Sequence, residues 1–434
     1  MTAPEAGTSR RTGITPAALL CSTLLAVAPM AAPVLVPVLG LSLIPAYTAA
    51  GLRLDELARA IAGPSRVFAG LSLLGVYLFV NAFWSPVPAF AFRVAGFYFF
   101  LGFTVLLALR TIPQEGTELT RRWSRGICAG LALGSLVLLF EVLTDQTITR
   151  LLMSYAPILL DSRHAVLKDG WVVQLPAFRP NRSALVLALC LWPVLLNVFA
   201  VRLDRWKRVA IYAALLAGVV AVALSDHETS KLALVGSALV FLTGRFSLTV
   251  ARWLVVAGWL VATALAVPLA NYAYSEGLHR ASWLPYSARD RVVIWQFTAE
   301  RIAHAPVLGT GIGAARTSAL EEKGKVAPDT ALRRRLSWHS HNAYLQIWFE
   351  TGAVGAGLLL GAGLLIICAI GAAPLLAQPY LYAAFAACAL AAATSYSIWA
   401  PWFMACLALV PMLAAMGIGL LKGDNAPDTR QRRQ

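Results

Sequence analysis

The chain has 434 residues, of which 59% are hydrophobic and 13% are charged, and its mean hydropathy is +0.69. Soluble proteins carry about 25% charged residues, so this composition excludes a disordered chain, a collagen-like chain, a disulfide scaffold and an ordinary soluble enzyme. The formal net charge of +15 would suggest nucleic acid as a partner of a soluble protein, but here the basic residues must first be assigned to a side of the membrane. The composition predicts an integral membrane protein.

Apolar runs of transmembrane length repeat along the chain, since a spanning helix needs about 20 largely uncharged residues. The stretch between Arg11 and Arg53 has room for two spans, and the absence of charge between Glu350 and Lys422 leaves room for three more. The remaining runs lie near residues 67–84, 87–109, 126–143, 183–200, 208–224, 230–244 and 252–272. The pattern predicts about twelve transmembrane helices.

Short loops rich in Lys and Arg alternate along the chain, and such loops stay in the cytoplasm. Their basic residues include Arg53, Arg59, Arg66, Arg110, Arg121, Arg122, Arg125, Arg202, Arg205, Lys207 and Arg208. An even number of spans then places both termini in the cytoplasm. A cleaved signal peptide after Arg10 and Arg11 is the alternative, but the apolar run continues past any cleavage point, and losing one span would break the alternation.

Two outer segments are long, residues 145–182 and residues 273–341, so we expect the chemistry there. The predicted organisation is nine spans in residues 1–272 with an outer loop near 145–182, a large outer loop in 273–341, three spans in 342–421 and a cytoplasmic tail in 422–434. By this topology all six histidines lie outside the membrane on the same side, in these two segments or in a short outer loop, at positions 164, 227, 279, 304, 339 and 341.

Many arginines and lysines also fall in the outer segments, where a solvated charged face is the ordinary interpretation. Arg182 and Lys231 differ because each lies at the predicted start of a span. Cations at the membrane boundary favour an anionic ligand, and arginine is a good partner for phosphate. A lipid diphosphate is the natural candidate.

Residues 339–352 predict a helix that enters the membrane from outside, with Ser340 or Asn342 near its N-cap. Asn342, Gln346 and Glu350 are four residues apart and share one face of this helix. Polar groups at such a depth face the protein interior or a cavity. The pattern therefore predicts a polar stripe below His341.

His341 has three interpretations. The first is a capping or packing residue, and the second is a metal ligand together with His339, although His-x-His without a nearby third ligand is a weak motif. The third is a general base. A helix N-terminus and neighbouring arginines disfavour the imidazolium ion, so the ring stays neutral and can accept a proton at pH 7.

Other motifs carry little chemistry. The six cysteines lie within apolar runs and suggest neither a metal site nor a disulfide framework. Residues 309–313 (Gly-Thr-Gly-Ile-Gly) lack the Lys and Ser or Thr of a phosphate loop, so a turn is favoured over a nucleotide site. Neither a carboxylate pair for glycoside hydrolysis nor a Ser-His-Asp arrangement stands out. None of these motifs points to a cofactor.

The chain resembles the O-antigen ligase and O-antigen polymerase family of polytopic bacterial membrane proteins, which assemble lipopolysaccharide. The resemblance covers most of the chain and is most specific over residues 176–352. The stretches that carry it are Pro180-Asn181-Arg182-Ser183-Ala184, Arg291-Val292-Val293-Ile294-Trp295, Pro306-Val307-Leu308-Gly309-Thr310-Gly311-Ile312-Gly313, and His341-Asn342-Ala343-Tyr344-Leu345-Gln346 with Glu350 and Gly352.

This resemblance implies transfer of a glycan from undecaprenyl diphosphate to a sugar hydroxyl of lipid A-core at the periplasmic face of the inner membrane, with inversion and without nucleotide or metal. It implies an all-α, GT-C-like membrane protein whose large periplasmic loop, between the ninth and tenth spans, carries short helices. His341 matches the family's proposed catalytic histidine, and Arg291 matches an arginine thought to contact the diphosphate.

Lys231 falls where many family members have a second arginine, and it offers a point charge instead of a bidentate fork. Arg182 is therefore a further candidate for binding the diphosphate. Asn342, His339 and Asn181 are candidates for binding the acceptor or supporting the site.

Three alternative functions remain open from the sequence. A polymerase of the same family shares these motifs and joins carrier-linked repeats to each other. A solute transporter suits twelve spans, but transporters tend to show internal repeats and polar or broken segments near the midplane. An assembly role without catalysis would leave His341 and the outer arginines without a shared purpose.

Overall fold

The structure is a computed structural model that describes residues 14–49, 65–112, 117–156, 165–176, 178–325 and 339–425, with isolated positions between 53 and 63. Helices dominate because a backbone in lipid must satisfy its own N–H and C=O groups. The first half forms α1 (Pro16–Val27), α2 (Ala32–Ala49), α4 (Arg66–Asn81), α5 (Pro88–Thr111), α6 (Glu118–Leu143), α7 (Thr147–Tyr155), strands β1 (Val166–Lys168) and β2 (Trp171–Gln174), α8 (Asn181–Ala200) and α9 (Arg205–Leu224). The second half forms α10 (Glu228–Phe246), α11 (Leu248–Ala264), α12 (Ala266–Ser275), α13 (Tyr286–Ile302), α14 (Ala314–Lys325), α16 (Ala343–Gly371), α17 (Gln378–Thr394) and α18 (Pro401–Asn425).

Each of the twelve predicted apolar runs coincides with helical structure. Among the described residues, eight helices are long and apolar enough to cross a membrane, and α11 with α12, bent by 72°, could form a ninth span. The remaining three runs correspond to α1 and α17, which are shorter at 12 and 17 residues, and to α10, which has 19 residues but is not among the eight candidate spans. The prediction of a helical multi-pass membrane protein is confirmed, whereas the count of twelve spans stays a prediction.

One small feature departs from the all-α prediction. In the outer segment before α8, β1 pairs with β2 in an antiparallel hairpin. The second predicted outer segment contains the helices α13 and α14, and its residues 326–338 lie outside the described residues. Its position outside the membrane, as a loop between two spans, stays a prediction. The predicted boundary at residue 272 falls inside α12, which ends at Ser275.

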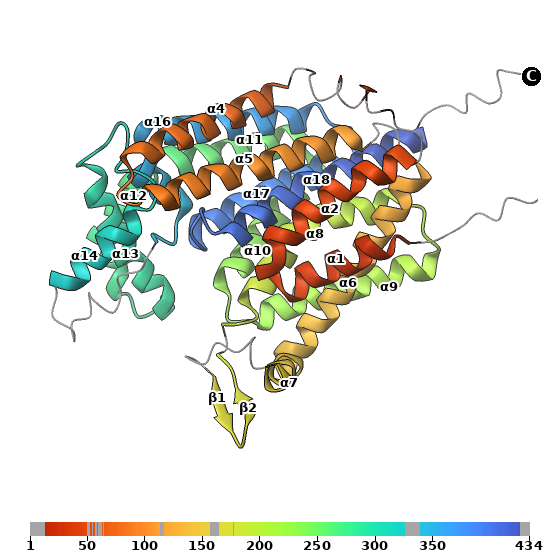
Figure 1. The fold of residues 1–434 in the computed structure, drawn as a ribbon, viewed down its shortest axis with the longest axis horizontal. Helices are drawn as coiled ribbons and strands as arrows, with labels where there is room; N and C mark the ends of the chain where they lie inside the picture. The colour runs from red at the N-terminus through yellow and green to blue at the C-terminus, as the bar shows by residue number, and fades with distance from the viewer. Residues whose placement is uncertain are drawn as a thin grey trace, which may run out of the picture.

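The helix α8 forms the centre of the bundle. Within its apolar window 83% of the residues are buried, compared with 28% in α4 and in α9. It packs against α6, α17 and α18 (Figure 1). A helix that is hydrophobic all round is expected in such a position, and α4 and α9 keep an outward face for lipid.

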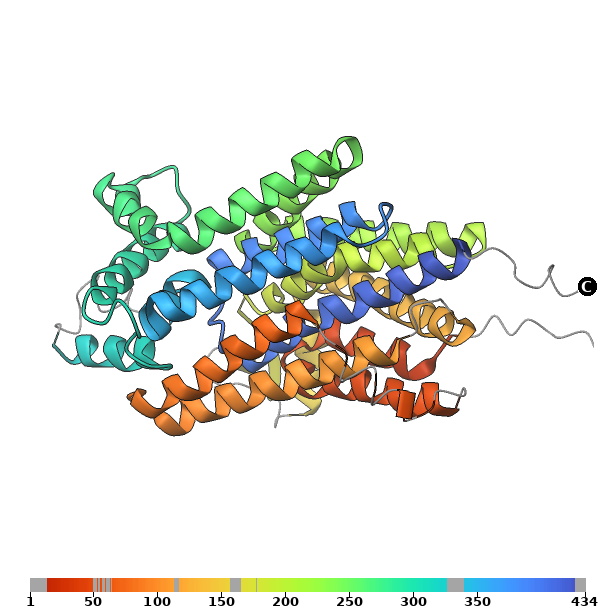
Figure 2. The same ribbon diagram turned by 90° about the horizontal axis from the view of Figure 1, so that it is seen from above.

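The basic loops gather at one end of the bundle. The Thr15 N–H donates to the Arg122 carbonyl at 3.2 Å, and Arg125 reaches the carbonyl of Arg202. The start of α1 and the end of α18 lie at the end opposite α13 and α14 (Figures 1 and 2). This arrangement agrees with the alternation of basic loops, and the cytoplasmic placement of the termini stays a prediction. Arg10, Arg11 and residues 426–434 lie outside the described residues.

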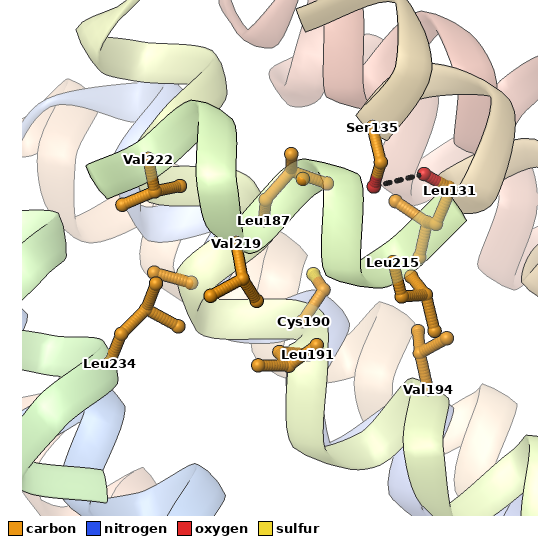
Figure 3. A pocket seen from close by; sticks show the side chains of 12 residues that line it. Leu131, Ser135, Leu187, Cys190, Leu191, Val194, Leu215, Val219, Val222 and Leu234 are labelled. Carbon is orange, nitrogen blue, oxygen red and sulfur yellow. Dashed lines mark hydrogen bonds between the residues drawn. The ribbon is translucent and has the colours of Figure 1, made fainter. Parts of the chain in front are cut away.

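A small apolar cavity lies between α6, α8, α9 and α10 (Figure 3). Its volume is about 10 Å³, room for about one water molecule. Leu187, Leu215 and Leu234 are among the side chains that line it, and the Ser135 hydroxyl donates to the Leu131 carbonyl. The cavity is too small for a prenyl chain, so we assign it no ligand.

The helix α16 is broken at Gly352, where φ is 64° and ψ is −166°. The turn at residues 306–313 fills the break, because the Ala353 and Val354 N–H groups donate to carbonyls of this turn and the Gly311 N–H donates to the Glu350 carbonyl. Backbone at membrane depth requires such internal partners. The glycine-rich segment is therefore a packed turn, as favoured from the sequence, and it holds the part of α16 before the break, residues 343–351, which we call the outer arm.

Candidate active site

Four helices begin at the same end of the bundle, close to the connection between α17 and α18. The N-terminus of α10 is joined to the end of α17 by a hydrogen bond from the Thr229 hydroxyl to the Thr394 carbonyl, at 2.8 Å. The outer arm of α16 is joined to the connection by Gln346, which donates to the Ser397 hydroxyl at 3.0 Å. The helices α8 and α18 complete the group through the aromatic contacts described below. Helix N-termini favour anions because their N–H groups and dipoles point outward.

His341 is held in an unusual backbone conformation next to the start of α16. Its φ of +51° lies in the left-handed region, which His, Asn and Asp adopt more readily than other side chains. Its N–H donates to His339 Nδ1 at 3.2 Å, and its Nδ1 lies 3.1 Å from the Ser395 carbonyl. Because a carbonyl only accepts, Nδ1 carries the hydrogen. In the neutral ring, Nε2 is then the atom that accepts a proton.

Burial keeps the three histidines of this region neutral. It lowers the pKa of His341 to about 3, with smaller contributions from the charges of His339 and Arg291. Burial and then the Arg291 charge lower the pKa of His339 and of His227 to about 4 each. The sequence predicted a neutral His341 from the helix terminus and arginines, but desolvation is the larger cause.

The low pKa values of these histidines predict that the folded protein loses stability on acidification. An unfolded histidine has a pKa near 6.5, so below that pH the unfolded chain binds more protons than the folded chain. The stability from the neutral rings is complete above about pH 6.5 and is lost towards the folded-state pKa values. We expect the thermal unfolding temperature in detergent to fall between about pH 7.5 and about pH 5, and to fall less in His341→Asn. His304, which is exposed, provides the control His304→Asn. An equal slope in wild type and His341→Asn would contradict this prediction.

Arg291 lies on α13, which packs against α16. Burial lowers the pKa of its guanidinium, while Tyr396 and Glu228 raise it. Its charge acts on His227, His339 and His341. The structure therefore brings Arg291 and His341, 50 positions apart in the sequence, into one electrostatic environment, and the catalytic and diphosphate-binding roles predicted for them stay predictions.

Arg182 and Lys231 have different surroundings. The Arg182 guanidinium carbon lies 5.7 Å from the ring centroid of Tyr396 and 5.8 Å from that of Trp402. Its buried Nε has no hydrogen-bond partner within the protein. Lys231 pairs with Glu228 at 2.9 Å on the same helix. The Arg182 side chain is therefore held by aromatic rings with hydrogen-bonding capacity to spare, whereas the Lys231 charge is already matched.

The support residues are placed as follows. The Asn342 side-chain oxygen accepts from the Tyr344 and Leu345 N–H groups, both at 3.0 Å, so Asn342 is the N-cap of α16. Asn181 is the first residue of α8 and is buried, and its side-chain oxygen has no partner within the protein. His339 orients the His341 backbone through the hydrogen bond given above.

Two residues of the predicted polar stripe, Gln346 and Glu350, are buried, and Asn342 is partly buried. The side chain of Glu350 is fully inaccessible to solvent and collects several hydrogen bonds. The Glu350 carboxylate accepts from the Ala315 N–H at 3.0 Å, from the Trp399 ring N–H and from Gln346 at 3.4 Å. It therefore links the start of α14 to the connection between α17 and α18.

Sequence reasoning missed the connection between α17 and α18. Ser395 orients His341, and the ring of Tyr396 lies 6.0 Å from that of His227 and 4.8 Å from that of Trp402. The available signal was the aromatic and serine-rich break, Ser395-Tyr396-Ser397-Ile398-Trp399-Ala400-Pro401-Trp402, inside an otherwise uniform apolar region.

Comparison with known protein families matches residues 211–360 to O-antigen ligase. This segment begins within α9, ends within α16 and contains Lys231, Arg291 and His341. Over residues 211–360, the chain is therefore similar to the O-antigen ligase family. Asn181, Arg182 and the connection between α17 and α18 lie outside the matched segment.

A curated protein that is similar to part of this chain comes from Rickettsia bellii (strain RML369-C) and is named "Putative polysaccharide ligase". The two proteins are 27% identical over 138 residues, which is 32% of this chain and 34% of the relative. The match thus spans about a third of the length of each protein.

Proposed function

We propose that this chain is an O-antigen ligase that transfers a glycan from undecaprenyl diphosphate to a sugar hydroxyl of lipid A-core at the periplasmic face of the bacterial inner membrane. The observation that carries the proposal is that a neutral histidine, His341, and the cation Arg291 share one site beside four helix N-termini. The Nδ1 atom of His341 is hydrogen-bonded to a carbonyl, so its Nε2 can accept a proton. The family match over residues 211–360 supports the same chemistry.

In this mechanism His341 Nε2 takes the proton from the acceptor hydroxyl as the oxygen attacks the anomeric carbon. The new C–O bond forms while the bond from that carbon to the phosphate oxygen breaks, and the diphosphate leaves with the bonding electrons. One displacement of this kind inverts the anomeric centre. Arg291 and a second cation stabilise the charge that develops on the leaving group. The prenyl tail stays in hydrocarbon, so the reaction takes place at the membrane boundary.

The low pKa of His341 fits an enzyme in which the imidazole becomes a stronger base when the lipid-linked donor binds. The Arg291 charge contributes to lowering the pKa of His341. A bound diphosphate offsets that positive charge and raises the pKa of the imidazole, because an opposite charge nearby favours the protonated ring. Base strength thus increases only when the leaving group is in place.

We assign the second diphosphate-binding cation to Arg182, with Lys231 in a lesser role. Removing a charged hydrogen-bond donor costs about 1.5–3 kcal/mol, so Arg182→Ala is expected to raise the KM for the lipid-linked donor about 10- to 100-fold. Lys231→Ala should change that KM only a few-fold, because Lys231 is paired with Glu228. Arg182→Lys should fall between wild type and Arg182→Ala, since it keeps the charge and loses the planar stack. A larger effect from Lys231→Ala than from Arg182→Ala would reverse the assignment.

The deciding experiment incubates purified protein with undecaprenyl-diphosphate glycan, with and without lipid A-core, with a chelator in parallel samples. If the lipid A-core gains glycan, seen as a shift of its band to higher mass, and the chelator does not prevent this, the result supports a metal-independent ligase. A lengthening carrier-linked ladder without lipid A-core indicates a polymerase of the same family. Absence of product in both contradicts the proposal, and counterflow of labelled solute in liposomes then tests the transporter alternative.

A further inference from the structure

The outer segment between α6 and α8 contains a small unit with its own core, formed by α7, β1 and β2. Met153 of α7 packs against Val172 of β2 and Leu175, and all three side chains are buried. The Ser154 hydroxyl accepts the Val172 N–H at 2.9 Å. We call this the α7–hairpin unit, consisting of residues 147–156 and 165–175.

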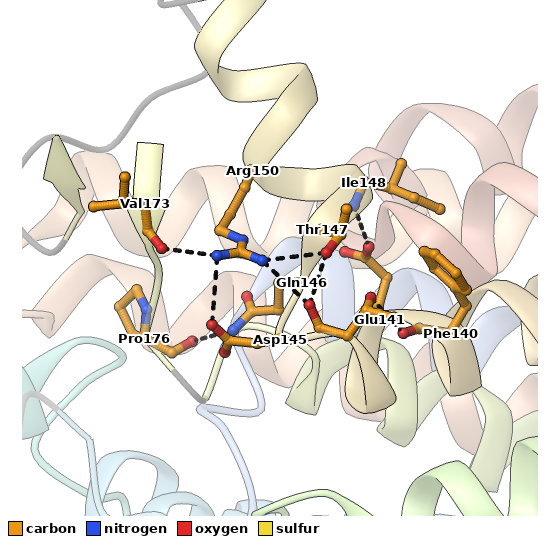
Figure 4. Close-up of polar contacts among 10 residues, drawn as sticks. Phe140, Glu141, Asp145, Gln146, Thr147, Ile148, Arg150, Val173 and Pro176 are labelled. Atoms are coloured by element: carbon orange, nitrogen blue, oxygen red, sulfur yellow. Dashed lines mark hydrogen bonds and ion pairs between the residues drawn. The ribbon is translucent and has the colours of Figure 1, made fainter. Parts of the chain in front are cut away.

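The α7–hairpin unit is fastened to the end of α6 by polar contacts (Figure 4). Glu141 accepts from the Ile148 N–H at 2.7 Å and from Thr149, so its carboxylate satisfies N–H groups at the start of α7. Arg150 donates to the Val173 carbonyl at 2.8 Å. Gln146 donates to the Pro176 carbonyl at 3.1 Å, which fixes the end of the segment that follows β2. These contacts give the unit a defined orientation relative to the spans.

The unit turns large apolar side chains outward. Leu152 is 56% exposed, Tyr155 is 77% exposed and Trp171 is 47% exposed, and the rings of Tyr155 and Trp171 lie 5.4 Å apart. Leu151 on α7 and Phe178 next to α8 are also exposed. Soluble proteins rarely leave such a cluster in water, so this surface requires an apolar partner.

The positions of the neighbouring spans identify the partner. The candidate span α6 ends at Leu143 and the candidate span α8 begins at Asn181, so the chain leaves and re-enters the membrane on either side of the unit. The hairpin projects sideways from the flank of the bundle, whereas α13 and α14 extend beyond its end (Figure 1). Tyr and Trp side chains are enriched at the membrane–water interface, where short amphipathic helices lie in the membrane plane.

We propose that the α7–hairpin unit lies in the membrane–water interface at the end of the bundle that carries the candidate site. Leu152, Tyr155 and Trp171 then contact the boundary between lipid head groups and acyl chains. The unit is continuous with the start of α8, and so it holds Arg182 at the depth of the head groups. The inference rests on the membrane-spanning helices and is independent of the proposed glycan transfer.

The test measures the environment of spin labels on the unit. Leu152→Cys and Tyr155→Cys are placed in a background whose six native cysteines are replaced by alanine, and the labelled proteins are reconstituted in phospholipid nanodiscs. We expect both labels to be more accessible to oxygen, which concentrates in lipid, than to a water-soluble nickel chelate. A label at His304→Cys, on an exposed residue after α13, provides the control and should show the reverse order.

Two results would overturn the inference. Greater accessibility of the labels at 152 and 155 to the nickel chelate places the surface in water. Inaccessibility to both reagents places it against protein. If the cysteine-free background does not assemble, the same substitutions in the native chain are labelled with a membrane-impermeant maleimide in proteoliposomes. Position 304 should then react readily, whereas positions 152 and 155 should react about tenfold more slowly and become reactive after detergent is added.

Discussion

Replacement of His341 by asparagine is expected to lower the rate of glycan transfer by about 10²- to 10⁴-fold, the usual contribution of a positioned general base. Asparagine is the informative substitution because His341 has a φ of +51° and Asn tolerates the left-handed region, whereas Ala adds backbone strain of about 1–2 kcal/mol. The variant therefore removes the proton acceptor and preserves the start of α16. The measurement is the initial rate of transfer with the KM for the donor determined separately.

A general base affects the rate far more than donor binding, so we expect kcat to fall and the donor KM to change only a few-fold. The exposed His304 provides a matched control, and His304→Asn should transfer glycan at the wild-type rate. His341→Asn or His341→Ala with wild-type activity would exclude His341 as the base. A folded His341→Asn protein whose only defect is a raised donor KM would assign the residue to binding.

Replacement of Gly352 by alanine is expected to destabilise the protein by roughly 3 kcal/mol or more, since it combines backbone strain with overpacking. The φ of 64° and ψ of −166° at Gly352 lie in a region that glycine almost alone adopts. An added Cβ would also overlap the Val307 carbonyl and the Gly309 nitrogen. Both effects push the turn at 306–313 away from α16, so transfer activity should fall along with the unfolding temperature.

Gly357 provides the matched control for this substitution because it lies on the same helix. A Cβ at Gly357 meets nothing within 4 Å, and alanine has the higher helix propensity by about 1 kcal/mol. Gly357→Ala should therefore leave the unfolding temperature in detergent unchanged or slightly raised. Equal unfolding temperatures for Gly352→Ala and Gly357→Ala would contradict the role assigned to the break in α16.

The two substitutions test separate parts of one arrangement. His341 lies just before the start of α16, and Gly352 lies where the turn at 306–313 supports the same helix. Glu350 joins this support to the connection between α17 and α18. The position of the proposed base thus depends on packing around Glu350 as well as on its own hydrogen bond to Ser395.

Local features of the site were readable from the sequence. Asn342 was predicted near the N-cap and caps α16, and the spacing of Gln346 and Glu350 predicted the buried polar stripe. The pairing of Lys231 with Glu228 was not predicted, although it too is a contact between residues three apart on one helix. These features depend on helix geometry over a few residues, which the order of residues specifies directly.

The sequence by itself determined that this chain is a helical multi-pass membrane protein, because the length of an uncharged run and the need to satisfy backbone hydrogen bonds in lipid act along the chain. Only the tertiary structure decided which polar groups meet. Ser395 orients His341, and Tyr396 and Trp402 hold Arg182, although these partners are 54 or more positions apart. Such contacts depend on which helices pack against each other. Because the apolar surfaces of these helices resemble one another, the sequence pattern does not indicate which two helices will be neighbours. Burial, the main cause of the low pKa of His341, arises from the same packing.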